Sequence, residues 1–396
     1  MKKVVVLGGA GAMGQVIVHD LAESSSIDQV VIADFNKDKA EELKGKVGSP
    51  KVSAAFADLK DPKSLAEVLR GAGIVINSTP YYFNVAVMEA ALNAGCHYMD
   101  LGGLFHVTRE QLKLHERFKE KNLLAVLGMG AAPGMTNVMA AAAAEHLDTI
   151  DSIDIIVGAI DFVEVDHPLA PPYALDTILD EYTKEPMVFQ DGEYLAKPPM
   201  SGEVEVDFPA PVGNCSAILT LHSEVLTLPE TYKYKGVKLV TFRLGLPQVF
   251  HEKLKLLVDI GLGGSEKINV ENVQVTPRKV LAKLLERFPT PEQEPDDCEV
   301  VRVDVRGKAA GADKLVRMET TVLADKRWKL SCGALDTGVP PSIVAQMILN
   351  NQINQTGVLA PEVCVPAKPL FDELAKRKIV MRQEIISQEP AAARGR

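Results

Sequence analysis

Three glycines near the start of the chain have the spacing that holds the diphosphate of a dinucleotide. Gly9, Gly11 and Gly14 follow the apolar run Val4–Leu7, and Asp34 ends the next apolar run. In this pattern the first glycine permits a tight turn, the second lets the backbone approach a pyrophosphate, and the third lets helix and strand pack closely. The N–H groups at the start of the following helix favour negative charge. The alternative is an ordinary glycine-rich turn, but the strand, the helix and the later acid together predict dinucleotide binding.

The residues after the second strand indicate which dinucleotide is bound. The Asp34 carboxylate is placed to accept hydrogen bonds from the adenosine ribose and would repel a 2′-phosphate. The next residue is Phe35, not an arginine that could form an ion pair with that phosphate. The sequence therefore predicts NAD rather than NADP. Asp58 ends the third strand, where it bounds the adenine or, alternatively, caps the following helix. The predicted cofactor-binding residues are Gly9, Gly11, Ala12, Met13, Gly14, Asp34, Phe35, Asp58, Leu59, Asn77, Ser78, Thr79 and Pro80.

The elements that position these residues alternate between strand and helix over the first 130 residues. Such repeated units predict an α/β fold of the Rossmann type, with a doubly wound parallel sheet. After Gly128 the pattern changes to β-branched runs and proline-rich loops, which predict an inserted α+β second domain. We predict a dinucleotide domain at 1–134, a substrate and dimerisation domain at 135–335, returning helices at 336–387 and a mobile tail at 388–396.

Unusual stretches lie where ligands bind in such a fold, beyond the carboxyl ends of the strands. The fourth strand ends in the polar and aromatic stretch 77–84, the fifth in 98–103 and the sixth in the Gly/Pro break 129–134. We expect these three loops to border the nicotinamide and the reacting substrate.

Several of these stretches resemble the saccharopine dehydrogenase family in order and spacing. Besides the glycine motif, the resemblance rests on Pro80–Phe83, Asp100–Gly103, Ala132–Met135, Thr241–Arg243 and His251–Asp259. Within the family, the chain length and Asp100-Leu101-Gly102-Gly103 are most similar to lysine 6-dehydrogenase. The resemblance implies NAD-dependent oxidation of the side-chain amine of lysine, and a second domain that also forms a homodimer interface.

The chain departs from the family pattern in its second half. Where the family tends to have a Gly-Gly pair, a small residue and proline, this chain has Gly158-Ala159-Ile160-Asp161. Where the family often has arginine, tyrosine, a spacer and Gly-His, this chain has Arg243-Leu244-Gly245-Leu246-Pro247. Two alternatives therefore stay open beside an amino-acid dehydrogenase that acts on a C–N bond. One is a saccharopine- or opine-type reductase of the same family, and the other is a non-catalytic NAD-binding regulatory protein.

Amine oxidation needs a base, and an amino-acid substrate needs a cation for its carboxylate. Asp100 is a candidate to contact the amine; alternatively, it caps the loop that follows it. His222 is a candidate base with Glu224 as its partner; alternatively, the two form a surface pair. Arg243 interrupts an apolar strand, where it binds the substrate carboxylate or pairs within the domain. The predicted catalytic residues are Asp100, His222 and Glu224, and the predicted substrate-binding residues are Tyr81, Gly102, Gly103, Thr136, Asn137 and Arg243.

Composition narrows the remaining function classes. The length of 396 residues favours two domains, and the net charge of −10 argues against nucleic acid or an anionic membrane as a partner. No apolar run reaches the length that a bilayer requires. The five cysteines are scattered without a Cys-x-x-Cys pair, which favours a reducing cytoplasm and predicts neither a disulfide framework nor a metal site.

Overall fold

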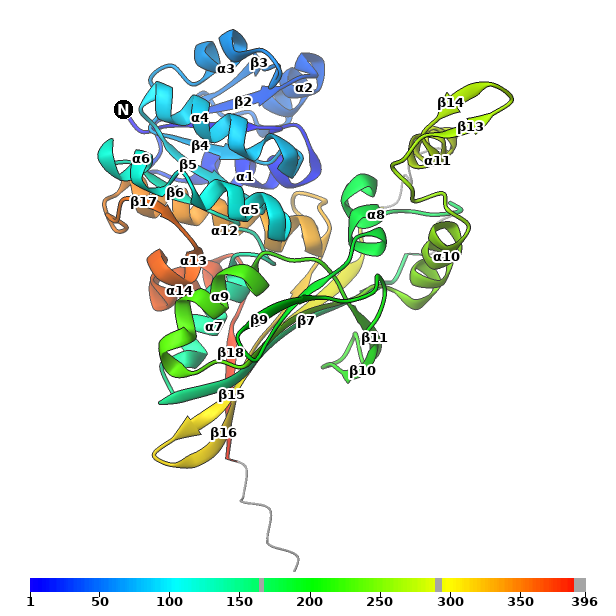
Figure 1. Ribbon diagram of the computed structural model, residues 1–396. Coiled ribbons are helices and arrows are strands. Elements are labelled where there is room, and N and C mark those ends of the chain that lie inside the picture. The colour runs from blue at the N-terminus through cyan, green and yellow to red at the C-terminus, as the bar shows by residue number, and fades with distance from the viewer. Residues whose placement is uncertain (164–166, 289–293, 388–396) are drawn as a thin grey trace, which may run out of the picture.

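The computed structural model describes residues 1–163, 167–288 and 294–387, so the predicted tail at 388–396 lies outside the described residues. Two large sheets organise the chain (Figure 1). The N-terminal sheet, coloured blue to cyan, lies above a longer green and yellow sheet, and helix α12 (Cys332–Leu349) runs between them. The structure confirms the predicted fold class, a Rossmann-type parallel sheet joined to a second α+β part.

The first sheet is parallel throughout, in the order β17-β6-β5-β4-β1-β2-β3. Apart from the half-buried edge strand β3, its strands are short and largely apolar runs buried on both faces, as parallel strands covered by helices require. The strand order reverses direction between β1 and β4, where open α/β sheets bind their ligands. The strands are β1 (Lys3–Leu7), β2 (Gln29–Asp34), β3 (Val52–Phe56), β4 (Ile74–Asn77), β5 (His97–Asp100), β6 (Leu124–Val126) and β17 (Gly357–Leu359). The helices are α1 (Ala12–Glu23), α2 (Lys37–Val47), α3 (Pro62–Val68), η1 (Tyr81–Phe83), α4 (Asn84–Ala94), α5 (Leu104–Leu112) and α6 (His115–Glu120).

The second sheet is mixed, in the order β10-β11-β12-β7-β15-β16-β18, with β8 and β9 continuing from β12. Its strands are β7 (Thr149–Asp161), β8 (Met187–Gln190), β9 (Glu193–Ala196), β10 (Val204–Asp207), β11 (Asn214–Leu219), β12 (Leu239–Gly245), β15 (Asp297–Ala309), β16 (Ala312–Leu323) and β18 (Arg382–Ser387). The remaining elements are α7 (Met135–Ala144), α8 (Leu175–Thr183), α9 (Glu224–Tyr232), η2 (Lys233–Lys235), α10 (Gln248–Asp259), β13 (Ile268–Val270), β14 (Val273–Val275), α11 (Pro277–Leu285), α13 (Pro361–Cys364) and α14 (Ala367–Lys376).

Part of the predicted returning segment, 336–387, packs on the first sheet. Helix α12 contacts α1, and β17 pairs with β6. Strand β18, in contrast, pairs with β16 and belongs to the second sheet. The predicted domain boundaries themselves stay predictions.

Pro340 and Pro341 do not separate two helices, although such a pair is typical of a helix break. Helix α12 continues through both residues. A proline inside a helix removes a backbone hydrogen bond and costs about 3 kcal/mol. Burial offsets this cost, because α12 packs against α1 on one side and against β15 and β16 on the other.

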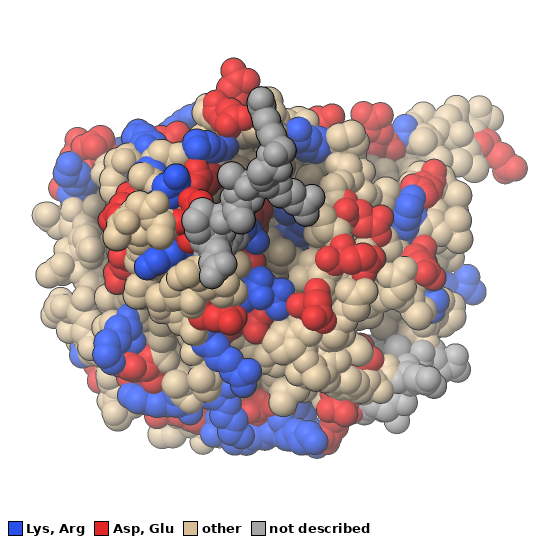
Figure 2. All heavy atoms as spheres, turned by 90° about the horizontal axis from the view of Figure 1, so that it is seen from below, with Lys and Arg blue, Asp and Glu red and all other residues tan. Residues whose placement is uncertain are grey.

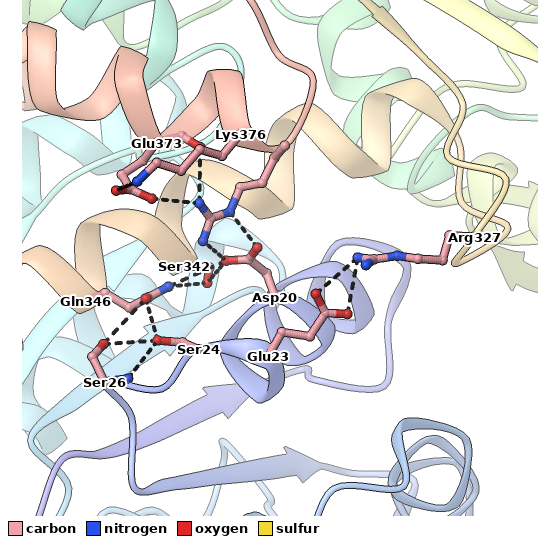
Figure 3. A network of polar contacts seen from close by, with 10 residues as sticks. Asp20, Glu23, Ser24, Ser26, Arg327, Ser342, Gln346, Glu373 and Lys376 are labelled. Atoms are coloured by element: carbon pink, nitrogen blue, oxygen red, sulfur yellow. Dashed lines mark hydrogen bonds and ion pairs between the residues drawn. The ribbon is translucent and has the colours of Figure 1, made fainter.

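A buried ion pair fixes α1 to the C-terminal helices (Figure 3). One edge of the Arg377 guanidinium contacts both oxygens of the Asp20 carboxylate, with Nε 2.6 Å from Oδ1 and Nη2 3.0 Å from Oδ2. The Ser342 hydroxyl of α12 donates to the same carboxylate at 2.5 Å, and Glu373 accepts from Arg377 at 2.9 Å. Asp20 is 4% exposed, so its charge depends on these partners for the solvation that it lost on folding.

Charges of both signs are interspersed over the coloured atoms of the face in Figure 2. Within the described residues, no helix has the length and the apolar composition needed to cross a membrane.

Candidate functional site

The junction of β1 and α1 fits a dinucleotide phosphate. Gly9, Gly11, Ala12, Met13 and Gly14 all lie in this turn or in the first turn of the helix. A Cβ atom on Gly14 would lie 2.3 Å from the carbonyl oxygen of Gly8, so only glycine allows helix and strand to approach this closely. The turn therefore presents bare backbone at a helix N-terminus, which is the surface that a diphosphate binds.

The Asp34 carboxylate stands beside this turn at the end of β2. Its Oδ2 accepts from the backbone N–H of Ala10 at 3.1 Å, and its Oδ1 accepts from that of Asn36 at 2.9 Å. Phe35 is 71% exposed, and its ring centroid lies 5.6 Å from that of Phe56 at the end of β3. The two rings are tilted by 46° to each other, and they place exposed apolar surface at adjacent strand ends beside the carboxylate, where an adenosine could pack.

Asp58 and Leu59 follow β3 at the outer end of this region. Asp58 accepts from the backbone N–H of Lys60 at 2.9 Å, and Leu59 is partly buried. The side chain that caps α3 is Asp61, which accepts from Lys63 at 3.0 Å, so the alternative that Asp58 caps this helix is wrong.

The side chains at the end of β4 are engaged within the protein. The Asn77 amide donates to Asn84 at 2.9 Å and accepts from the Thr79 hydroxyl at 2.6 Å, while the Ser78 hydroxyl donates to a carbonyl of β1 at 2.6 Å. The backbone N–H groups are engaged as well, that of Ser78 with the Leu7 carbonyl at 3.0 Å and that of Thr79 with Asn77 Oδ1 at 3.3 Å. The hydroxyl groups of Ser78 and Thr79 were predicted to contact the cofactor, but in this structure both already donate within the protein.

Asp100 is fully buried at the end of β5 and receives four hydrogen bonds. The donors are the Tyr98 hydroxyl at 2.8 Å, the Gln111 amide at 2.6 Å and the backbone N–H groups of Gly102 and Gly128 at 2.9 and 2.8 Å. Burial raises the pKa of Asp100 above its ordinary value, although the four donors act in the opposite direction. This geometry favours the alternative that Asp100 holds the two substrate-side loops together.

Gly102 and Gly103 are the residues that this anchor positions. Gly102 has a φ of 135°, which glycine adopts readily, and its carbonyl accepts from Asn84 at 3.0 Å. A Cβ on Gly103 would lie 2.4 Å from Oε1 of Gln111, so this position also requires glycine.

A buried histidine lies between two glutamates where the second part meets the first sheet. His222 Nδ1 is 3.2 Å from Glu224 Oε2, and its Nε2 is 3.8 Å from Glu181 Oε1. The imidazole stacks on Phe242, with ring centroids 3.5 Å apart and planes 8° from parallel. Burial alone would lower the pKa of His222, but the two carboxylates outweigh it and raise the pKa to about 9. The Tyr173 hydroxyl donates to Glu181 and extends the cluster.

Helix α7 attaches this cluster to the end of β6. The helix begins directly after the Gly/Pro break, and its buried Thr136 donates to Glu224 Oε1 at 2.9 Å. Asn137 instead donates to Glu362 of α13 at 2.9 Å, and its Oδ1 accepts from the backbone N–H of Gly134 at 2.9 Å. Of the residues predicted from the sequence, the structure thus brings His222, Glu224 and Thr136 together and places Asn137 in a neighbouring network.

Tyr81 joins the two parts of the chain beside the end of β4. Its hydroxyl donates to Asp180 of α8 at 2.7 Å and accepts from Lys184 at 2.6 Å. Arg278 of α11 donates to the same carboxylate at 2.7 Å. Burial alone would raise the pKa of Asp180, but the bonds from Tyr81 and Arg278 hold it below its ordinary value.

Arg243, which was predicted to bind the substrate carboxylate or to pair within the domain, does not face the histidine cluster. Side chains alternate between the faces of a strand, and the adjacent residue Phe242 stacks on His222. Arg243 donates to the Thr241 hydroxyl at 2.7 Å and lies 3.8 Å from Asp154, on the other face of β12. This arrangement favours the alternative of an ion pair within the second sheet.

The sequence prediction missed several ionisable residues near the contact between the two parts of the chain. These are Tyr173, Asp180, Glu181, Lys184, Arg278, Glu299 and Asp336. Asp336 could have been found, because it is the single charged residue in the largely apolar run 332–349. Glu181 has no comparable signal, since its partner His222 lies 41 positions away.

Two family descriptions together cover nearly the whole chain. "Saccharopine dehydrogenase NADP binding domain" matches residues 4–126, and "Saccharopine dehydrogenase C-terminal domain" matches residues 130–380. Among solved structures, the saccharopine dehydrogenase (L-Glu forming) of Saccharomyces cerevisiae superposes with a TM-score of 0.75. It covers 98% of this chain and 100% of its own, at 19% sequence identity, and supports the fold.

Two relatives of known activity are similar over about 70% of the chain. Carboxyaminopropylagmatine dehydrogenase of Synechocystis sp. is 25% identical over 72% of this chain and 72% of its own. Carboxynorspermidine synthase of Vibrio cholerae is 28% identical over 70% of this chain and 71% of its own. The predicted similarity to lysine 6-dehydrogenase is not supported by these relatives. The chain belongs to the saccharopine dehydrogenase family, as an NAD(P)-dependent oxidoreductase with an NAD(P)-binding Rossmann domain.

Proposed function

We propose that this enzyme makes or oxidises the C–N bond of a carboxylated polyamine. In the forming direction, a primary amine, an aldehyde carried by an amino acid, NAD(P)H and a proton give a secondary amine, NAD(P)⁺ and water. The observation that carries the proposal is the buried His222 between Glu181 and Glu224, at the carboxyl edge of the dinucleotide domain. The named relatives, whose products or substrates are carboxylated amines by their printed names, support the same class.

The charge of the site favours an amine-rich substrate over an amino acid with several carboxylates. One imidazolium stands between two glutamates, which leaves the cluster with an excess negative charge. Arg243, the arginine predicted to bind a carboxylate, lies on the opposite face of β12. An ammonium group complements such a cluster, whereas a polycarboxylate would be repelled by it.

Bound NAD(P) would supply the hydride exchange at the substrate carbon, and the side chains of this enzyme would manage protons and orientation. His222, protonated at neutral pH, donates a proton to the hydroxyl that leaves when amine and aldehyde condense. Glu224 and Glu181 orient the imidazole, and Thr136 fixes Glu224. Asp100 positions the glycine loop, so that the substrate carbon is held in one geometry.

A panel of amines followed by NAD(P)H absorbance tests this proposal. We expect NAD(P)H consumption only when a diamine and an amino acid with a side-chain aldehyde are both present. Oxidation of lysine with NAD and no aldehyde would instead identify a lysine dehydrogenase. Turnover of lysine with a keto acid would identify a saccharopine-type reductase, and bound cofactor without any turnover would identify a regulatory protein.

We further propose that NAD is preferred over NADP, because the Asp34 carboxylate faces the predicted ribose position. Replacing Asp34 by alanine should weaken NAD binding about tenfold or more, since hydrogen bonds to a charged group contribute about 1.5–3 kcal/mol. The same change should improve NADP binding by removing repulsion of the 2′-phosphate. Fluorescence titration with both reduced cofactors measures this, and unchanged NADP affinity would contradict the ribose assignment.

The homodimer that the family resemblance implies, and a cytoplasmic location, also stand as proposals. Sedimentation of the purified chain tests the first of them.

A further inference from the structure

The hairpin β13–β14 and helix α11 form an arm, residues 268–288, that projects from the body of the second part (Figure 1). Among the described residues, the two strands pair only with each other and belong to neither large sheet. Each strand therefore leaves one edge of backbone groups unpaired, and an isolated two-stranded hairpin is only marginally stable in water. Nearly half of the large apolar side chains exposed in the described residues lie at 249–288, about a tenth of the chain. The arm lacks the packing partner that such a hairpin needs.

One face of the hairpin is apolar. The register places Ile268 opposite Val275 and Val270 opposite Val273. These four side chains share a face, whereas the pair between them is polar. Ile268, Val270 and Val273 are 50%, 48% and 60% exposed. β-Branched side chains stabilise a strand by packing on a half-buried surface, and in the single chain that surface is uncovered.

Helix α11 continues this apolar face. Pro277 and Leu281 are buried, while Val280 and Leu284 are exposed and lie one helical turn apart. A groove of about 520 Å³ lies between β14 and α11, and Val275, Val280 and Leu284 are part of its lining. Apolar surface that continues from one exposed element to the next commonly marks a protein–protein contact.

The base of the arm is held in place. Arg278, the second residue of α11, donates to the Gly263 carbonyl at 3.0 Å and to Asp180 of α8 at 2.7 Å. The same carboxylate accepts from Tyr81 at 2.7 Å. A surface fixed in this way loses little conformational freedom when a partner covers it.

The charges on the arm indicate what covers it. The groove beside α11 is lined by basic side chains, whereas the hairpin carries exposed acids at its tip and just before β13. The basic residues are Lys279, Lys283 and Arg287, and the acids are Glu271 and Glu266. Within the described residues, neither acid has a cation within 4.0 Å, and Lys279 has no carboxylate at that distance. Opposite charges at the two ends of one apolar surface fit a second copy turned by 180°, in which each end contacts the other's opposite end.

We propose that the arms of two copies of this chain pack against each other about a two-fold axis. The hairpin of each copy lies over α11 of the other, which buries the apolar faces of both. At the rim, Glu271 of one copy pairs with Lys279 of the other. This inference rests on the homodimer proposed above, and it names the surface that forms the dimer.

Sedimentation equilibrium of the full chain over a range of concentrations tests the contact. Wild type should dimerise. Val273→Asp on the hairpin and Leu284→Asp on α11 should each raise the dimer Kd at least about tenfold, because the new carboxylate would be buried in an apolar contact. The control is Leu323→Asp, since Leu323 is 58% exposed at the end of β16, outside the arm. This change should leave the dimer Kd within about twofold of wild type.

Charge reversal tests the rim of the contact separately. Lys279→Glu and Glu271→Lys should each raise the dimer Kd, and the two changes together should return it to within about threefold of wild type, because the pair is restored with its charges exchanged. All four altered positions on the arm are exposed, so thermal melting followed by circular dichroism should match that of wild type.

A wild-type dimer that none of the arm variants weakens would overturn the arm as the contact surface and leave the homodimer itself standing. A wild type that stays monomeric at every concentration would contradict both. Neither result depends on turnover, which tests the proposed chemistry.

Discussion

Replacing His222 by asparagine is expected to lower kcat by about 10²- to 10⁴-fold in either direction of the reaction, which is the usual contribution of a positioned acid or base. The imidazole is the titratable group between Glu181 and Glu224, and asparagine cannot exchange a proton there. NADH affinity should change little, because the dinucleotide turn is formed by other residues. Stopped-flow single turnovers and a cofactor titration on the same preparation measure both quantities.

The pH profile distinguishes proton transfer from a purely structural role of His222. In the synthesis direction kcat should fall as pH rises through about 9, because the imidazolium that protonates the leaving hydroxyl is lost. Glu224→Gln removes a carboxylate that raises this pKa, so the alkaline limb should move to lower pH. Glu230→Gln, an exposed carboxylate of the same helix, should leave the profile unchanged. A His222 variant with kcat within about fivefold of wild type would remove His222 from the chemistry.

Replacing Arg377 by methionine is expected to destabilise the protein by about 3–5 kcal/mol, the usual cost of leaving a buried carboxylate without its partner. Arg377 contacts both oxygens of Asp20, which is 4% exposed. Only the uncharged donors Ser342 and Gln346, 2.5 and 3.5 Å from Oδ2, would remain beside this charge among the described residues. Urea denaturation followed by circular dichroism measures the change as a lower midpoint.

A double variant serves as the control for this ion pair. Combining Asp20→Leu with Arg377→Met removes both charges and should recover much of the lost stability, as buried ion pairs replaced by apolar residues often do. Cofactor affinity should be close to that of wild type in both variants at temperatures where they are folded. A single variant that loses less than about 1 kcal/mol would show that solvent, not Arg377, compensates Asp20.

The dinucleotide domain could be predicted because its signals are local. The spacing of Gly9, Gly11 and Gly14 and the alternating apolar runs each depend on neighbouring residues, and the structure shows the parallel sheet that they indicate. The continuous helix α12 could not be predicted, because Pro340 and Pro341 disfavour a helix locally. Only the packing of α12 between two sheets, which the sequence does not display, outweighs that preference.

The candidate site could be predicted only in part, for the same reason. His222 and Glu224 stand two positions apart, so their contact was visible in the sequence. Glu181 reaches the same imidazole from α8, and such distant contacts depend on the tertiary fold. Arg243 illustrates the reverse error: an arginine in an apolar strand needs a partner, but a shift of one residue decides which face of the sheet it meets.

The product of the complete reaction tests the central claim most directly. The purified enzyme is incubated with propane-1,3-diamine, an amino acid carrying a side-chain aldehyde and NAD(P)H, and the mixture is examined by mass spectrometry. The account predicts a new secondary amine whose mass equals the two reactants less one oxygen atom, formed only while NAD(P)H is consumed. Lysine oxidised in the presence of NAD, with no such adduct from the diamine, would contradict it.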